Sequence, residues 1–78
     1  MSSILESATA HDHDLKIRAA AALRESPYLT GRQLRLESQE GHVTLHGHVG
    51  SFFQKQMAQE SLRHLDGLHA IDNQLEVV

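Results

Sequence analysis

The sequence predicts an α+β fold, a two-layer αββαβ sandwich with two helices on one face of a three-stranded mixed sheet. Two segments, beginning near residues 14 and 51, repeat apolar residues with helical spacing. Two others, residues 33–48 and 71–77, alternate apolar with polar residues as strands do. The order is helix, strand, strand, helix, strand. The second helix lies between the second and third strands, and such a crossover makes those strands parallel and right-handed.

The first helix is expected over residues 14–25. Its apolar side chains recur at i, i+4, i+7 and i+8 and share one face: Leu15, Ala19, Ala22 and Leu23. Asp12 or Asp14 is placed to cap its start, and Pro27 follows its end, because the residue before a proline avoids the helical conformation. Ile17 lies off this face. Residues 1–13 are expected to be a flexible leader and residues 14–78 a single domain.

Residues 33–48 are expected to form a hairpin. Glu40 and Gly41 fit a two-residue turn in which the glycine supplies a positive φ. This turn length fixes a register in which Gln39 faces His42. In the same register apolar residues face one another, since Leu36 faces Leu45 and Leu34 faces Gly47. The missing side chain of Gly47 would allow a helix to approach closely.

Ser51 is expected to begin the second helix, with Gln54 completing a capping box and Gly67 ending the helix in a left-handed cap. Its apolar face consists of Ala58, Leu62 and Leu65. In the third strand Asn73 shares the apolar parity, so it needs a hydrogen-bond partner. Because both helices lie on one side, no element is left to cover the other face of the sheet.

Composition limits the classes of function. A chain of 78 residues with no cysteine forms one modest core without disulfides or thiolate metal sites. A net charge of −3 argues against a nucleic-acid partner, which requires clustered lysine and arginine. No signal-peptide pattern and no apolar run of about 18 residues is present. We therefore expect the protein to stay in the cytoplasm.

Several motifs resemble those of the BON domain family. They are Pro27 with Leu29, Leu34-x-Leu36, Gly41-x-Val43-Thr44-Leu45-x-Gly47-x-Val49-x-Ser51, Ala58, and Gly67-Leu68-x-x-Ile71-x-Asn73-x-Leu75-x-Val77. The resemblance spans residues 14–78 in order and spacing. It implies an αββαβ fold with a mixed sheet and offers no catalytic residues or cofactor. It also implies attachment to phospholipid membranes or bacterial envelope components, often in the periplasm, as in the osmotically induced proteins of the family.

The histidines are the most unusual feature, with seven in 78 residues. His42, His46 and His48 share strand parity and are expected on the uncovered face, with Arg35 beside His46 and Glu37 diagonal to His42 and His46. Imidazole and carboxylate groups suit Zn²⁺, but Arg35 would repel it, so we expect no metal. Two interpretations of this face stay open. One is a solvated polar surface, and the other, which we rank above a metal site, is a face on which histidine protonation alters association with a protein partner or a second copy.

Phe52 and Phe53 are the other notable feature. Adjacent helical residues point about 100° apart, so both rings cannot face the core equally. We expect them to cover the open end of the core, one of them against Met57. The alternative interpretation makes Phe52 and Phe53 an exposed contact for a membrane or a ligand.

Catalytic motifs are missing from the sequence. It contains no glycine-rich phosphate loop, nucleophile elbow or His-Glu-x-x-His. We therefore predict a non-catalytic binding module that attaches to membrane or envelope components. The alternative is a protein-interaction or homo-oligomerisation domain that uses the histidine-rich sheet face.

Overall fold

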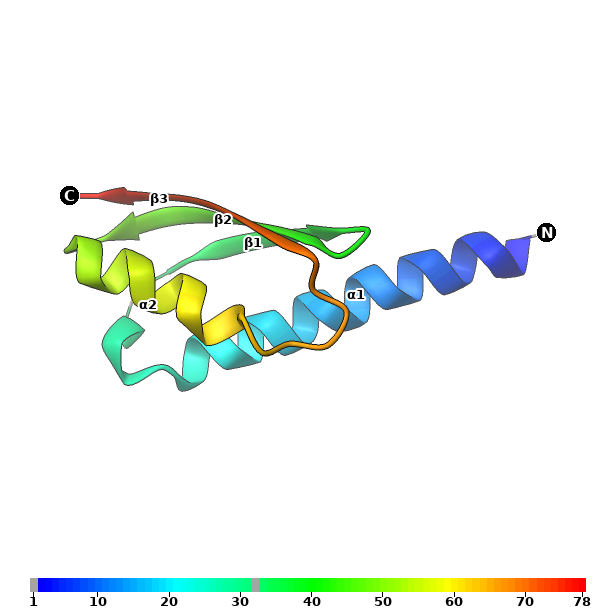
Figure 1. The fold of residues 1–78 in the computed structure, drawn as a ribbon, viewed down its shortest axis with the longest axis horizontal. Helices are drawn as coiled ribbons and strands as arrows, with labels where there is room; N and C mark the ends of the chain where they lie inside the picture. The colour runs from blue at the N-terminus through cyan, green and yellow to red at the C-terminus, as the bar shows by residue number, and fades with distance from the viewer. Residues whose placement is uncertain (1, 32) are drawn as a thin grey trace.

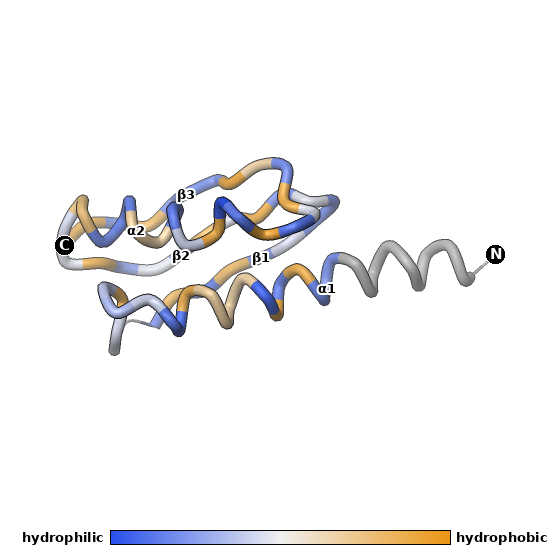
Figure 2. Tube along the Cα trace, turned by 60° about the horizontal axis from the view of Figure 1, so that its bottom comes forward, coloured by the Kyte–Doolittle hydropathy of each residue, from blue (hydrophilic) through white to orange (hydrophobic). Residues whose placement is uncertain are grey.

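The computed structural model describes residues 2–31 and 33–78, with side chains described from Asp12 onward. The elements in order are helix α1 (Ser2–Glu25), the 3-10 helix η1 (Pro27–Leu29), strands β1 (Arg35–Gln39) and β2 (His42–Val49), helix α2 (Phe52–Leu62) and strand β3 (Ala70–Val77). Both helices lie on the same side of the sheet (Figure 1). Along α2 and the strands, hydrophobic positions are interspersed with hydrophilic ones (Figure 2). The predicted α+β class, with two helices and a three-stranded mixed sheet, is confirmed.

The sheet has the order β1-β2-β3, with β1 antiparallel and β3 parallel to the central strand β2. The hairpin register is the predicted one, since Gln39 pairs with His42 and Leu36 with Leu45. Both turn residues have positive φ, 52° at Glu40 and 81° at Gly41, as a two-residue turn of this kind requires.

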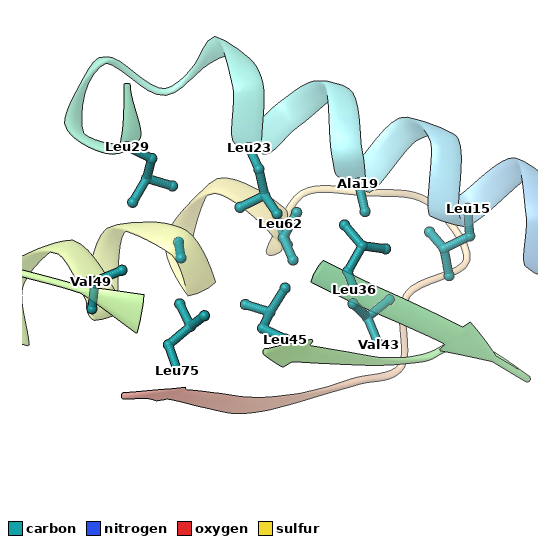
Figure 3. Packing of buried hydrophobic residues seen from close by; sticks show 11 residues of the cluster. Leu15, Ala19, Leu23, Leu29, Leu36, Val43, Leu45, Val49, Leu62 and Leu75 are labelled. Atoms are coloured by element: carbon teal, nitrogen blue, oxygen red, sulfur yellow. The ribbon is translucent and has the colours of Figure 1, made fainter. Parts of the chain in front are cut away.

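The core lies between the helices and the inner face of the sheet (Figure 3). Its buried members come from all these elements: Leu15, Ala19, Leu23, Leu29, Leu36, Val43, Leu45, Val49, Ala58, Leu62 and Leu75. Asn73 faces the same side and finds the partners it needs. Its Nδ2 donates to the Lys55 carbonyl oxygen at 2.8 Å, and its Oδ1 accepts from the Leu75 N–H at 3.2 Å.

Main-chain bonds also fix both ends of β2 to the segment containing β3. At one end the carbonyl oxygen of Gly41 accepts from the N–H groups of His69, at 2.8 Å, and Ala70, at 3.3 Å. At the other end the Val49 carbonyl oxygen accepts from the Val78 N–H at 2.9 Å. The hairpin turn is thereby held against the connection from α2 to β3.

Helix α1 begins at Ser2, so the expected start near residue 14 is wrong. Asp12 and Asp14 lie inside the helix, so neither side chain caps its start. The Asp12 carboxylate instead accepts from the Glu40 N–H in the hairpin turn, at 2.8 Å, and Asp14 pairs with Arg18 one turn on, at 3.5 Å. Alanine favours helix, which is consistent with the longer element. The flexibility of the leader over residues 1–13 stays a prediction.

The roles of two glycines in the structure also differ from those that the sequence predicts. Helix α2 ends at Leu62, because the Arg63 N–H donates to the Glu60 carbonyl oxygen and tightens the last turn. Gly67, with φ of +86°, therefore lies in the following loop and not at the helix end. Gly47 is approached by the chain before β1 and not by a helix, since an added Cβ would lie 3.0 Å from Leu34 Cδ2.

Candidate functional site

Three aromatic side chains gather where η1 meets the start of α2, and we call them the aromatic end: Tyr28, Phe52 and Phe53. Their exposed fractions are 49%, 75% and 51%. The Tyr28 and Phe53 rings meet edge to face, with centroids 5.0 Å apart. The expectation that Phe52 and Phe53 cover the core is therefore wrong. Sequence reasoning missed Tyr28, whose place depends on how η1 packs.

Hydrogen bonds at the start of α2 hold this arrangement. The Ser51 hydroxyl accepts from the Gln54 N–H at 3.1 Å, which is the predicted cap. The Gln54 side chain accepts from the Gly50 N–H at 2.6 Å and donates to the Tyr28 carbonyl oxygen at 2.9 Å. Gln54 thus joins the first turn of α2, which carries Phe52 and Phe53, to η1, which carries Tyr28.

Packing explains why the rings remain outside. Leu29 from η1 and Val49 from β2 already fill the core at this end, with exposed fractions of 4% and 0%. Ala58 supplies the buried contact from α2. The first helical turn therefore has no room to turn a phenyl ring inward.

The second surface is the uncovered side of the sheet, which we call the histidine face: Arg35, Glu37, His42, His46 and His48. His46 is half-buried and the other four are exposed. Glu37 Oε1 lies 3.3 Å from His46 Nε2, across the diagonal that the sequence predicts. Among the side chains that the structure describes, no group of three or more histidines and carboxylates is arranged to hold a metal ion.

Strand β3 adds carboxylates that the sequence did not assign to this face. Its register sets Asp72 beside Thr44 and Glu76 beside His48. With neutral imidazoles, one arginine and three carboxylates (Glu37, Asp72, Glu76) give the face a charge of −2. Protons on all three histidines change that charge to +1. Protonation of the three histidines therefore reverses the sign of the charge on this face.

Comparison with known families identifies the chain. The family model of the BON domain matches residues 11–78. The chain belongs to the BON domain family. No curated protein matches it significantly. Over the described ranges 2–31 and 33–78, the BON domain has no helix with the length and apolar character that crossing a bilayer requires.

A solved structure shares the fold of this BON domain. It is the C-terminal domain of CdsD, described as the structural protein of the type III secretion system of Chlamydia trachomatis. The TM-score is 0.70 at 14% sequence identity, over 86% of this chain and 33% of that one. At this identity the likeness shows the fold alone.

Proposed function

We propose that this BON domain is a non-catalytic binding module that attaches to phospholipid membranes or envelope components through its aromatic end. The observation that supports the proposal is the exposure of Phe52 and Phe53, 75% and 51%, beside Tyr28. Tyrosine is enriched at the boundary between lipid headgroups and acyl chains, and phenylalanine is common on the apolar face of helices that lie in this boundary. Burial of a phenylalanine side chain contributes about 1.5–3 kcal/mol. Two partly exposed rings therefore give weak, reversible attachment.

Charge adds little to this attachment. The chain carries a net charge of −3, so anionic headgroups do not attract it as they attract a polybasic segment. Binding is therefore expected to depend on apolar insertion, with similar retention by neutral and anionic vesicles and little dependence on salt.

Co-sedimentation with vesicles of phosphatidylcholine, with and without phosphatidylglycerol, tests the proposal. We expect the vesicles to retain the protein and the double variant Phe52→Ser, Phe53→Ser to lose most of this retention. Ile17→Ser is the matched control, because Ile17 on α1 has the same exposed fraction as Phe53, 51%. Absence of retention, or an equal loss in the control, contradicts membrane attachment through these rings.

The second candidate is a protein-interaction or self-association domain that uses the histidine face. The observation that favours it is the open sheet side with three histidines, whose charge changes from −2 to +1 on protonation. Association through this face should depend on the protonation of these histidines. Identical sedimentation coefficients at pH 5 and pH 8 would exclude such an interface between copies of the chain.

A further inference from the structure

We propose that the outer edge of β1 binds an extended peptide from a partner protein as an additional antiparallel strand. The peptide carries acidic and apolar side chains in alternation. This inference does not depend on membrane attachment, because it uses a different surface from the aromatic end.

The main chain of β1 provides the first argument. The Gly41 and Val49 carbonyl oxygens are bonded on the β3 side, so the odd residues of β2 turn their main-chain groups toward β3. The even residues of β2 therefore turn theirs toward β1, where they pair with Arg35, Glu37 and Gln39. The intervening residues Leu36 and Ser38 direct their N–H and C=O groups outward. Such an edge is a template for another strand.

The surface beside this edge provides the second argument. Two adjoining hollows, of about 420 and 470 Å³, share Ala20 on α1 with Leu34 and Leu36 at the β1 edge. We call them the edge groove. Leu23 and Leu29 also line it, so its wall on the helix side is apolar. An added strand would place every second side chain in this groove.

Charge provides the third argument. Three cationic side chains line the edge groove, Lys16, Arg24 and Arg35, whereas Glu37 is its one carboxylate among the described residues. None of these cations forms an ion pair with a described side chain. Arg35 lies on the sheet face toward which the acidic side chains of an added strand would point. Lys16 and Arg24 on α1 add positive charge beside the same edge, so an acidic partner is favoured.

The helix layer argues for a peptide and against a second copy of the domain. Helix α1 packs against β1, the outer strand of the sheet. Neighbouring strands lie about 4.8 Å apart, so a two-fold pairing of β1 edges would bring two α1 helices too close. Packed helices require about 8–10 Å between their axes. An isolated extended segment has no such helix and avoids the clash.

A labelled octapeptide of alternating glutamate and valine serves as the probe, with binding measured by fluorescence anisotropy. In the proposed pairing the valines lie on the helix side and their N–H groups face β1. N-methylation of the valines should therefore weaken binding at least tenfold. N-methylation of the glutamates, whose N–H groups face away, should leave binding nearly unchanged. A peptide with lysine in place of glutamate should not bind.

Substitutions in the protein, in place of changes to the peptide, test the same edge. Arg35→Glu should weaken binding of the octapeptide at least fivefold. Arg63→Glu, directly after α2, is its control with the same change in charge. Ser38→Pro removes an outward N–H and should weaken binding, whereas Ser38→Ala should not. Amide NMR shifts on binding should be largest at Leu36 and Ser38.

Several outcomes would overturn the proposal. These are no binding of the glutamate-valine probe, equal binding after valine N-methylation, or equal effects of Arg35→Glu and Arg63→Glu. If Ser38→Pro does not fold, the two N-methylated peptides decide the question with the unaltered protein. A vesicle result of either kind leaves this test unaffected, because no lipid is present in it.

Discussion

At the scale of single residues, two glycines with the same backbone angle have different surroundings. Gly31 and Gly41 both have φ of +81°. Nothing lies within 4 Å of a Cβ added at Gly31. A Cβ added at Gly41 would overlap the His69 ring and lie 2.8 Å from the Gly67 carbonyl oxygen. Substitution of the two glycines therefore separates the free-energy cost of a positive φ from the cost of a steric clash with the added side chain.

Alanine substitutions at the two glycines should show this difference. Gly31→Ala is expected to lower the free energy of unfolding by about 1 kcal/mol, the cost of a left-handed residue with a side chain. Gly41→Ala should lower it by about 2–4 kcal/mol, because the turn must also separate from the loop after α2. Urea denaturation measures both. Equal losses would show that the turn does not need this close contact.

The residue scale also shows what sequence reasoning could reach. The turn chemistry at Glu40 and Gly41 determined the hairpin pairing, and an asparagine on the apolar face of the third strand required partners. Both expectations are confirmed, because each depends on neighbours within a few residues or on a general demand for hydrogen bonds. The exposure of Phe52 was not predictable in this way, since it depends on Leu29 and Val49 filling the core first.

At the scale of elements, the start of α2 positions the aromatic end. The Ser51 hydroxyl caps the helix, whereas the Ser61 hydroxyl donates to the Met57 carbonyl oxygen within the helix, at 2.8 Å. The Ser51 cap accepts from an N–H group at the helix start that has no partner within the helix. The Ser61 hydroxyl donates to a carbonyl oxygen inside the helix, which already accepts a main-chain hydrogen bond. The two serines therefore contribute differently to the same helix.

Ser51→Ala should lower the free energy of unfolding by about 1 kcal/mol, and Ser61→Ala should change it by less than about 0.5 kcal/mol. Chemical denaturation followed by circular dichroism compares them. Ser51→Ala should also reduce retention by vesicles, because Phe52 and Phe53 occupy the turn that the cap fixes. Equal stability of the two variants would mean that the cap does not hold this turn.

Element pairing marks another limit of prediction. The sequence placed polar residues on alternate positions of both β2 and β3, but it did not assign Asp72 and Glu76 to the histidine face. The two strands are joined through α2 and a loop, so no short turn fixes their register as it does in the hairpin. The carboxylates that make the face acidic with neutral imidazoles were missed for this reason.

At the scale of the whole molecule, the described core and the family match begin close together along α1. The first buried apolar side chain among those described is Leu15, and the BON match starts at residue 11. Asp12 adds the bond to the Glu40 N–H in the hairpin turn. The folding unit is therefore expected to begin near Asp12, slightly before the boundary at residue 14 that the sequence suggested.

Truncation tests this boundary. Removal of residues 1–11 should leave the urea midpoint nearly unchanged, because the core side chains and Asp12 remain. Removal of residues 1–13 should cost about 1 kcal/mol more, through loss of the bond from the Asp12 carboxylate to the hairpin turn. Loss of cooperative unfolding in the first truncation would show that the leader belongs to the domain.

The position of β2 has a consequence for local opening. It has a partner strand on each side, and the carbonyl oxygens of Gly41 and Val49 are bonded at its two ends. Fraying from a terminus does not release such a strand, so its amide protons should exchange with deuterium only when the whole domain unfolds. The outward amides of Leu36 and Ser38 lack that protection. The amides of β2, which we expect to exchange slowest, thus lie about 5 Å from the outward amides of the neighbouring strand β1, which we expect to exchange fastest.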